Sequence, residues 1–83
     1  MKISLRLYAT LSDYLPPGAE RNTVELTIPD GASPHQVLDE LHVPRALTHL
    51  VVVNGIYLDP ADRDKPVLHN GDRFAVWPPV AGG

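Results

Sequence analysis

The sequence predicts an α+β fold, in which a mixed sheet of four to five strands carries one main helix packed across one face. Three observations lead to this prediction. Short apolar segments with the pattern of strands occur on both sides of a single amphipathic segment with the pattern of a helix. Glycine and proline signals for tight turns separate these segments. The chain has 83 residues, which suffices for one small domain with one modest core.

The first two strands are predicted from strict alternation of apolar and polar residues. In the segment from Ile3 to Leu7 every second residue is apolar, which is typical of a strand with one face in water. The segment from Val24 to Ile28 has the same pattern. Pro16-Pro17-Gly18 predicts a turn between the two strands, and Pro29-Asp30-Gly31 ends the second one.

The main helix is predicted from Ser33 to Leu41. Ser33 is a good N-cap, Pro34 occupies the first helical position, and Gln36 follows Ser33 by three residues, which is a capping-box pattern. Pro44 is expected to end the helix at about residues 41 to 43. The apolar stripe of this helix consists of Val37, Leu38 and Leu41.

Three further strands are predicted in the second half of the chain. Leu50 to Val53 is a continuous apolar run, which indicates a strand covered on both faces. Asn54-Gly55 predicts a hairpin into a short strand, Ile56 to Leu58. A second tight turn at Asn70-Gly71-Asp72 precedes the last strand, Arg73 to Trp77, in which Phe74 and Val76 are expected to face the core.

This order of elements is satisfied by a ubiquitin-like β-grasp, in which the first and last strands lie side by side at the centre of the sheet. Pro78-Pro79 cannot donate ladder hydrogen bonds, so the sheet should stop there. We therefore expect one domain, with residues 1–77 forming the β-grasp and residues 78–83 forming an extended, polyproline-like C-terminal tail.

The composition argues against several classes of function. The chain has no cysteine and a net charge of −3, with no basic patch, so we expect no thiolate chemistry and no nucleic-acid binding. No apolar run approaches the roughly 18 residues of a membrane span, so we expect no membrane partner. The absence of cysteine fits a reducing compartment, so we expect a cytoplasmic location. The four histidines lack metal-ligand spacing, and no nucleophile–base pair or phosphate-binding loop is visible, so we predict no metal site and no catalysis by this chain alone.

The most informative feature is the diglycine at the end of the sequence, Gly82-Gly83. A glycine has no Cβ, so its backbone fits where other residues clash, and a terminal glycine carboxylate is the least hindered acyl group that a polypeptide can offer to an enzyme. The alternative is a frayed end or an expression artefact. The residues that precede the tail favour the first interpretation.

Three segments make the chain resemble the MoaD/ThiS family of ubiquitin-like sulfur carriers. They are Val51-Val52-Val53-Asn54-Gly55, Leu68-His69-Asn70-Gly71-Asp72 and Trp77-Pro78-Pro79-Val80-Ala81-Gly82-Gly83. The tail is the specific one, and its paired prolines resemble the small subunit of molybdopterin synthase more than the thiamine carrier. The short helix and the Pro16-Pro17-Gly18 loop depart from that subfamily, which leaves the pathway open.

The resemblance implies a function for the tail. An E1-like adenylating enzyme of the MoeB/ThiF type would join the carboxylate of Gly83 to AMP, using ATP and Mg, and a sulfur donor would then leave a thiocarboxylate on Gly83. The large subunit of molybdopterin synthase (MoaE type) would be the second partner. The chain itself would bind no cofactor. The alternatives are a carrier for thiamine or another sulfur-containing metabolite, a protein modifier conjugated through Gly83 to lysines, and an interaction module with an inert tail.

Partner-binding residues are expected in two places. The tail itself would thread into the partner, with Pro78 and Pro79 stiffening its exit, Val80 as an apolar anchor, and Ala81 and Gly82 keeping the approach narrow. The second place is the sheet, where Trp77, Tyr57, Tyr8 and Arg6 are candidates for a docking surface because aromatic residues are enriched at interfaces. A plain solvated sheet face is the alternative for these four residues.

Overall fold

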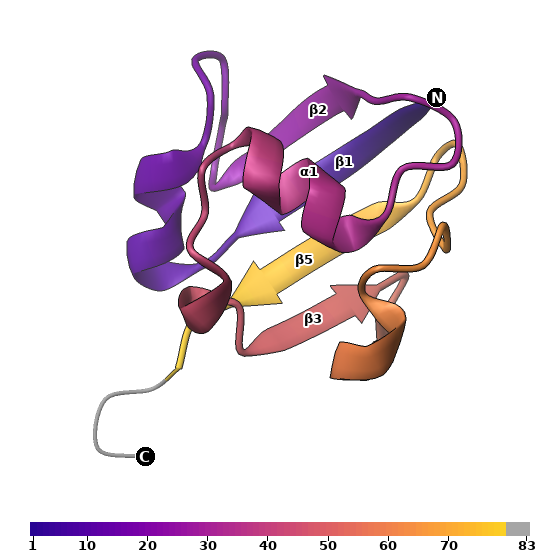
Figure 1. Ribbon diagram of the computed structural model, residues 1–83. Coiled ribbons are helices and arrows are strands. Elements are labelled where there is room, and N and C mark those ends of the chain that lie inside the picture. The colour runs from indigo at the N-terminus through magenta and orange to yellow at the C-terminus, as the bar shows by residue number, and fades with distance from the viewer. Residues whose placement is uncertain (80–83) are drawn as a thin grey trace.

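The computed structural model describes residues 1–79 and has the predicted α+β architecture. Five strands form one mixed sheet in the order β2-β1-β5-β3-β4, and the helix α1 lies across one face of it (Figure 1). The strands are β1 (Lys2–Leu7), β2 (Thr23–Thr27), β3 (Leu50–Val53), β4 (Ile56–Tyr57) and β5 (Arg73–Trp77), and the helix is α1 (Pro34–Glu40). Short 3₁₀ helices occupy Ala9–Tyr14, Arg45–Leu47 and Pro60–Asp62.

The first and last strands pair in parallel in the middle of the sheet, as the β-grasp prediction requires. Leu5 lies opposite Phe74 and Leu7 opposite Val76, and all four side chains are almost completely buried. They form the centre of a core that α1 covers on one side of the sheet (Figure 1). The remaining buried apolar residues are Ile3, Leu11, Ile28, Ala32, Val37, Leu38, Val43, Val51 and Leu68.

The start of α1 confirms the capping-box prediction. The Ser33 hydroxyl accepts a hydrogen bond from the Gln36 main-chain N–H at 3.1 Å, and the Gln36 side-chain oxygen accepts one from the Ser33 N–H at 2.8 Å. Two main-chain donors that the first turn would leave without partners are thereby satisfied. Pro34 occupies the first helical position, where its missing N–H costs nothing.

The helix α1 ends close to the predicted position, but for a different reason than the one predicted. The helix ends at Glu40 because His42 adopts a left-handed conformation, with φ of 62°. The N–H of Val43 then bonds to the Leu38 carbonyl and that of His42 to the Asp39 carbonyl, which is a Schellman motif. Pro44 lies beyond this cap, so it follows the stop and does not impose it.

We expect His42→Gly to stabilise the fold by about 0.5–1 kcal/mol, because a residue with a Cβ pays a penalty in the left-handed region that glycine avoids. His42 is exposed, so no packing is lost. Chemical denaturation would measure the gain. His42→Ala keeps the Cβ and serves as the control with no gain, and a His42→Gly chain less stable than the parent would contradict this account of the cap.

The hairpin after β3 is confirmed, but the expectation for β3 itself was wrong. Asn54 and Gly55 both have positive φ (52° and 82°), as a two-residue primed turn requires. In β3 only Val51 is buried, whereas Leu50 and Val52 are partly exposed. The continuous apolar run therefore reflects one buried face and one apolar face that keeps access to solvent.

Candidate functional site

The candidate site is the face of the sheet that points away from α1, which we call the open face. Strand register places its residues in two rows that cross the sheet. The first row runs from Arg6 through Ala75 and Val52 to Tyr57, and the second contains Trp77 opposite Leu50. All of these side chains are exposed or partly exposed, unlike their neighbours on the core side. The open face thus presents an accessible apolar surface across four strands.

An aromatic stack marks one end of the open face. The rings of Tyr8 and Trp77 lie 4.1 Å apart between centroids and only 6° from parallel. The Arg6 guanidinium carbon lies 5.0 Å from the centroid of the Tyr8 ring, within cation–π range. The stack forms because Tyr8 follows β1 directly and its N–H bonds to the Val76 carbonyl, which places it beside the last residue of β5. We call Arg6, Tyr8 and Trp77 the exit cluster.

The exit cluster lies where the chain leaves the sheet. The Trp77 carbonyl accepts a hydrogen bond from the His49 N–H at 3.0 Å, which is the last ladder contact of β5. Pro78 and Pro79 follow and cannot donate to a further strand, so the sheet ends at Trp77 as predicted. Pro78 is partly exposed and Pro79 is exposed. Any partner that receives the following residues must therefore approach past Tyr8 and Trp77.

The charges on the open face are mostly positive. By strand parity Lys2, Arg6 and Arg73 belong to it, and Glu25 is the acidic residue on the same face. Glu25 lies 3.7 Å from Lys2, which leaves Arg6 and Arg73 as unopposed cations among the described residues. An apolar surface flanked by guanidinium groups is complementary to a partner surface with an apolar centre and acidic residues around it.

The structure brings together three of the four candidates predicted on the sheet. Arg6, Tyr8 and Trp77 form the exit cluster, whereas Tyr57 lies three strands away from Arg6 along the first row. Tyr57 is half exposed, and Arg63 lies 5.8 Å from the centroid of its ring. The predicted tail residues Val80, Ala81, Gly82 and Gly83 lie outside the residues that the structure describes.

Among the open-face residues that sequence reasoning did not single out are Leu50, Val52, Arg73 and Ala75. For Arg73 and Ala75 the signal was present, because both have the same strand parity as Trp77. Leu50 and Val52 could not be placed, because a continuous apolar run does not say which of its faces is buried. The open face is therefore larger and more apolar than the four predicted residues suggested.

Within residues 1–79 no group of three or more acidic, histidine or cysteine side chains is arranged to hold a metal ion. None of the helices there has the length and apolar character that crossing a bilayer demands.

Comparison with known proteins identifies the chain at the level of family and fold. The family described as Mut7-C ubiquitin matches residues 1–82. The solution structure of the HVO 2177 protein from Haloferax volcanii has 27% sequence identity and a TM-score of 0.77, covering 100% of this chain and 87% of that one. Among curated protein sequences, none matches this chain significantly.

Two further solved structures share the fold at lower identity. SAMP1 from Haloferax volcanii has 21% identity and a TM-score of 0.67, with 100% of both chains covered. A chain from the complex of subunits 1 and 2 of molybdopterin-converting factor from Helicobacter pylori has 16% identity and a TM-score of 0.60, again with 100% of both chains covered. These likenesses confirm the ubiquitin-like β-grasp, and the resemblance to sulfur carriers holds at the level of this fold.

Proposed function

The chain belongs to the Mut7-C ubiquitin family, and from this premise we propose that it is a ubiquitin-like sulfur carrier whose functional group is the carboxylate of Gly83. The observation that carries the proposal is the position of the exit cluster. The diglycine sequence follows a proline pair that leaves the sheet beside Tyr8 and Trp77, on an apolar face flanked by cations. This arrangement would let one partner bind the open face and receive the tail at the same time.

The chemistry requires an activating partner. A terminal carboxylate has a pKa near 3.3–3.7 and is ionised and unreactive at neutral pH. We propose that a carboxylate oxygen of Gly83 attacks the α-phosphate of ATP held by an E1-like enzyme, with pyrophosphate as the leaving group. Sulfide (HS⁻), which a sulfur donor supplies, then attacks the acyl carbon, expels AMP and loses its proton, which leaves a thiocarboxylate. The partner supplies the nucleotide site and Mg, and this chain supplies the acyl group and the surface that orients it.

The proposed acceptor is a pterin precursor, with the large subunit of a molybdopterin synthase as the second partner and the cytoplasm as the compartment. The support is the Trp77-Pro78-Pro79-Val80-Ala81-Gly82-Gly83 sequence together with the shared fold of a molybdopterin-converting factor chain. A carrier for thiamine or another sulfur-containing metabolite would use the same terminus, so the acceptor is the part of the proposal that a partner pull-down from native extract decides.

A second candidate function is protein modification. The fold is shared with a protein from Haloferax volcanii that is named small archaeal modifier protein 1, with 20% identity and a TM-score of 0.64. A modifier needs the same activated glycine, but a target lysine and not a sulfide attacks the acyl carbon. The open face would serve the activating enzyme in the same way in both functions.

Mass spectrometry of the protein purified from its native cell tests these functions against each other. We expect a fraction of the chains to end at Gly83 and to carry one sulfur in place of one oxygen, because the thiocarboxylate is the proposed working state. Alkylation of the protein before analysis should label this terminus, since the chain has no cysteine to compete for the reagent. Gly83 joined to lysines of other proteins would favour the modifier. A native chain that continues past Gly83 without trimming would contradict both.

A further inference from the structure

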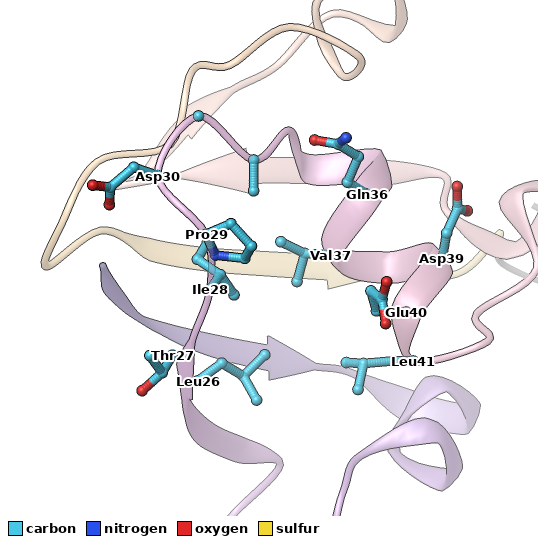
Figure 2. Close-up of a pocket in the computed structure, with 12 residues that line it drawn as sticks. Leu26, Thr27, Ile28, Pro29, Asp30, Gln36, Val37, Asp39, Glu40 and Leu41 are labelled. Atoms are coloured by element: carbon cyan, nitrogen blue, oxygen red, sulfur yellow. The ribbon is translucent and has the colours of Figure 1, made fainter.

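A groove lies on the opposite side of the molecule from the open face, between the edge strand β2 and the helix α1 (Figure 2). Its volume is about 720 Å³. Apolar side chains form its floor, and Leu26 of β2 and Leu41 at the end of α1 point toward one another across it (Figure 2). Ile28 and Val37 continue the apolar lining toward the start of the helix. Ile28 and Val37 belong to the buried core, whereas Leu26 and Leu41 are partly buried and pack against it.

The strand beside the groove has a free edge. Met1 and Ile28 exchange both main-chain hydrogen bonds, each 2.8 Å long, which fixes the alternation of bonded and non-bonded pairs between β1 and β2. Glu25 and Thr27 therefore belong to non-bonded pairs, and their N–H and C=O groups point away from β1. Within the described residues no strand pairs with this side of β2, apart from the turn that joins Glu20 to Thr23. Main-chain donors and acceptors that could pair with a further strand thus lie next to an apolar groove.

The charges around this edge are acidic. Asp30, Asp39 and Glu40 line the groove, which contains no lysine or arginine, and Glu25 lies on the other face of the same strand. The Arg45 guanidinium donates a hydrogen bond of 2.9 Å to Asp39 and holds the pKa of that carboxyl below its ordinary value, so Asp39 stays ionised at neutral pH. Asp30 contacts the Met1 amino group at 3.2 Å. Glu40 has no ion-pair partner within residues 1–79.

We propose that β2 and the groove bind an extended segment of a partner protein, in which apolar residues alternate with lysine or arginine. The segment adds to the free edge of β2 as a sixth strand. Its main chain bonds to Glu25 and Thr27, and its apolar side chains enter the groove against Leu26 and Leu41. Because side chains alternate along a strand, its basic side chains point to the opposite face of the sheet, where they meet Glu25.

A second copy of this chain is a poorer occupant. Antiparallel pairing of two β2 strands about their centre would place Glu25 opposite Glu25, and like charges directly opposite each other are destabilising. The groove also lies on the helix side of the sheet, whereas the tail leaves beside the open face. The inference therefore goes beyond the proposed function and does not rest on it, because a segment in the groove and an activating enzyme on the open face occupy different sides.

The probe for this surface is a short, end-blocked peptide in which lysine alternates with valine. Titrated into the isotope-labelled protein, it is expected to shift the amide resonances of Glu25, Thr27, Val37 and Leu41 and to slow hydrogen exchange at Glu25 and Thr27. A peptide with glutamate in place of lysine should bind at least about tenfold more weakly. N-methylation of alternate peptide amides should weaken binding by about tenfold when it blocks the residues that pair with β2. This last control needs no change to the protein.

Two variants test the same surface from the side of the protein. Thr27→Pro removes one edge-facing donor without touching the β1 ladder and should weaken binding about tenfold, whereas Thr27→Val should not. Glu25→Lys should weaken binding at low salt, with a smaller effect at high salt. Deletion of Gly82-Gly83 should leave peptide binding unchanged, which separates this proposal from the sulfur-carrier proposal. No binding, equal binding of the glutamate peptide, shifts centred on Tyr8 and Trp77, or self-association through β2 would each overturn the proposal.

Discussion

A Gly82→Val chain is expected to lose adenylation by its activating enzyme by about a hundredfold or more. The physical reason is the Cβ. An isopropyl group one residue before the reacting carboxylate widens a tail that must reach a nucleotide site inside another protein, and a displacement of the reacting atom by about 1 Å can cost this much in rate. Release of pyrophosphate, measured with the activating enzyme from the same cell, reports the adenylation step directly. An undiminished rate would contradict the assignment of the tail.

The fold should be unaffected by this change, because Gly82 lies beyond the described sheet, whose last ladder contact in β5 is at Trp77. Equal unfolding midpoints for the parent and variant chains would show that the rate loss is not a folding defect. Gly82→Ala provides a graded control, since a methyl group is smaller than an isopropyl group, and an intermediate rate is expected.

Trp77→Ala separates docking from chemistry. Trp77 lies on the open face where the chain leaves the sheet, but it is six residues before the proposed adenylated glycine in the sequence. Its loss should raise KM for the carrier about tenfold and leave kcat near its parent value, because interface aromatics contribute mainly to binding. Gly82→Val should do the reverse and lower kcat. A fall in kcat for Trp77→Ala would place this side chain in the reaction and not in docking.

Much of the fold was predictable because its signals are local. The capping box of Ser33 and Gln36, the Asn54-Gly55 hairpin and the alternation in β5 each depend on residues close together in the sequence, and all three are confirmed. The proline pair also correctly ended the sheet at Trp77. These features could be read without tertiary information because turn and cap geometry restricts which residues fit.

The parts that could not be predicted depend on contacts between distant segments. The 3₁₀ helix Ala9–Tyr14 buries Leu11 completely, yet its sequence has no helical period to reveal it. The helix was expected to end because of Pro44. It ends instead at a left-handed cap at His42, because the main-chain hydrogen bonds that close a helix can also form around a residue other than glycine. The open face was only partly identified, because placing Leu50 and Val52 on it needs the register between β3 and β5.

Arg63 is the clearest example of a residue whose structural role the sequence does not reveal, since it lies in a segment that the sequence predicts to be a polar loop. It is only 4% exposed. Its guanidinium donates hydrogen bonds to the carbonyls of Leu58, Thr48 and His49, at 3.1, 3.1 and 3.2 Å. No carboxylate lies within ion-pair distance of it among residues 1–79. Nη2 also donates to the Tyr57 hydroxyl at 3.5 Å. Through its three main-chain contacts this buried side chain connects the loop after β4 to the segment that leads into β3.

Arg63→Met should therefore lower the free energy of unfolding by about 3 kcal/mol, because it removes three hydrogen bonds from a charged donor and leaves buried carbonyls without partners. Methionine keeps an apolar stem, so the loss reports the guanidinium more than the packing. For a domain of this size the midpoint of thermal unfolding should fall by about 15 °C. Arg45→Met is the matched control: Arg45 is exposed and pairs with Asp39 on the surface, where solvent screens such pairs and the unfolding midpoint should change little.

The loss of the Arg63 guanidinium should also affect the point where the chain leaves the sheet. Hydrogen exchange at this point is therefore a second test of the prediction. Arg63 bonds to the carbonyl of His49, and the N–H of His49 holds the Trp77 carbonyl at the last contact of β5. Loss of the guanidinium frees the segment before β3, so hydrogen exchange at His49 should accelerate more than at Leu5 in the centre of the sheet. Uniform acceleration would mean that Arg63 contributes only to global stability. An unchanged midpoint together with unchanged exchange at His49 would show that these hydrogen bonds contribute little, and that the exit cluster is held by the Tyr8–Trp77 stack alone.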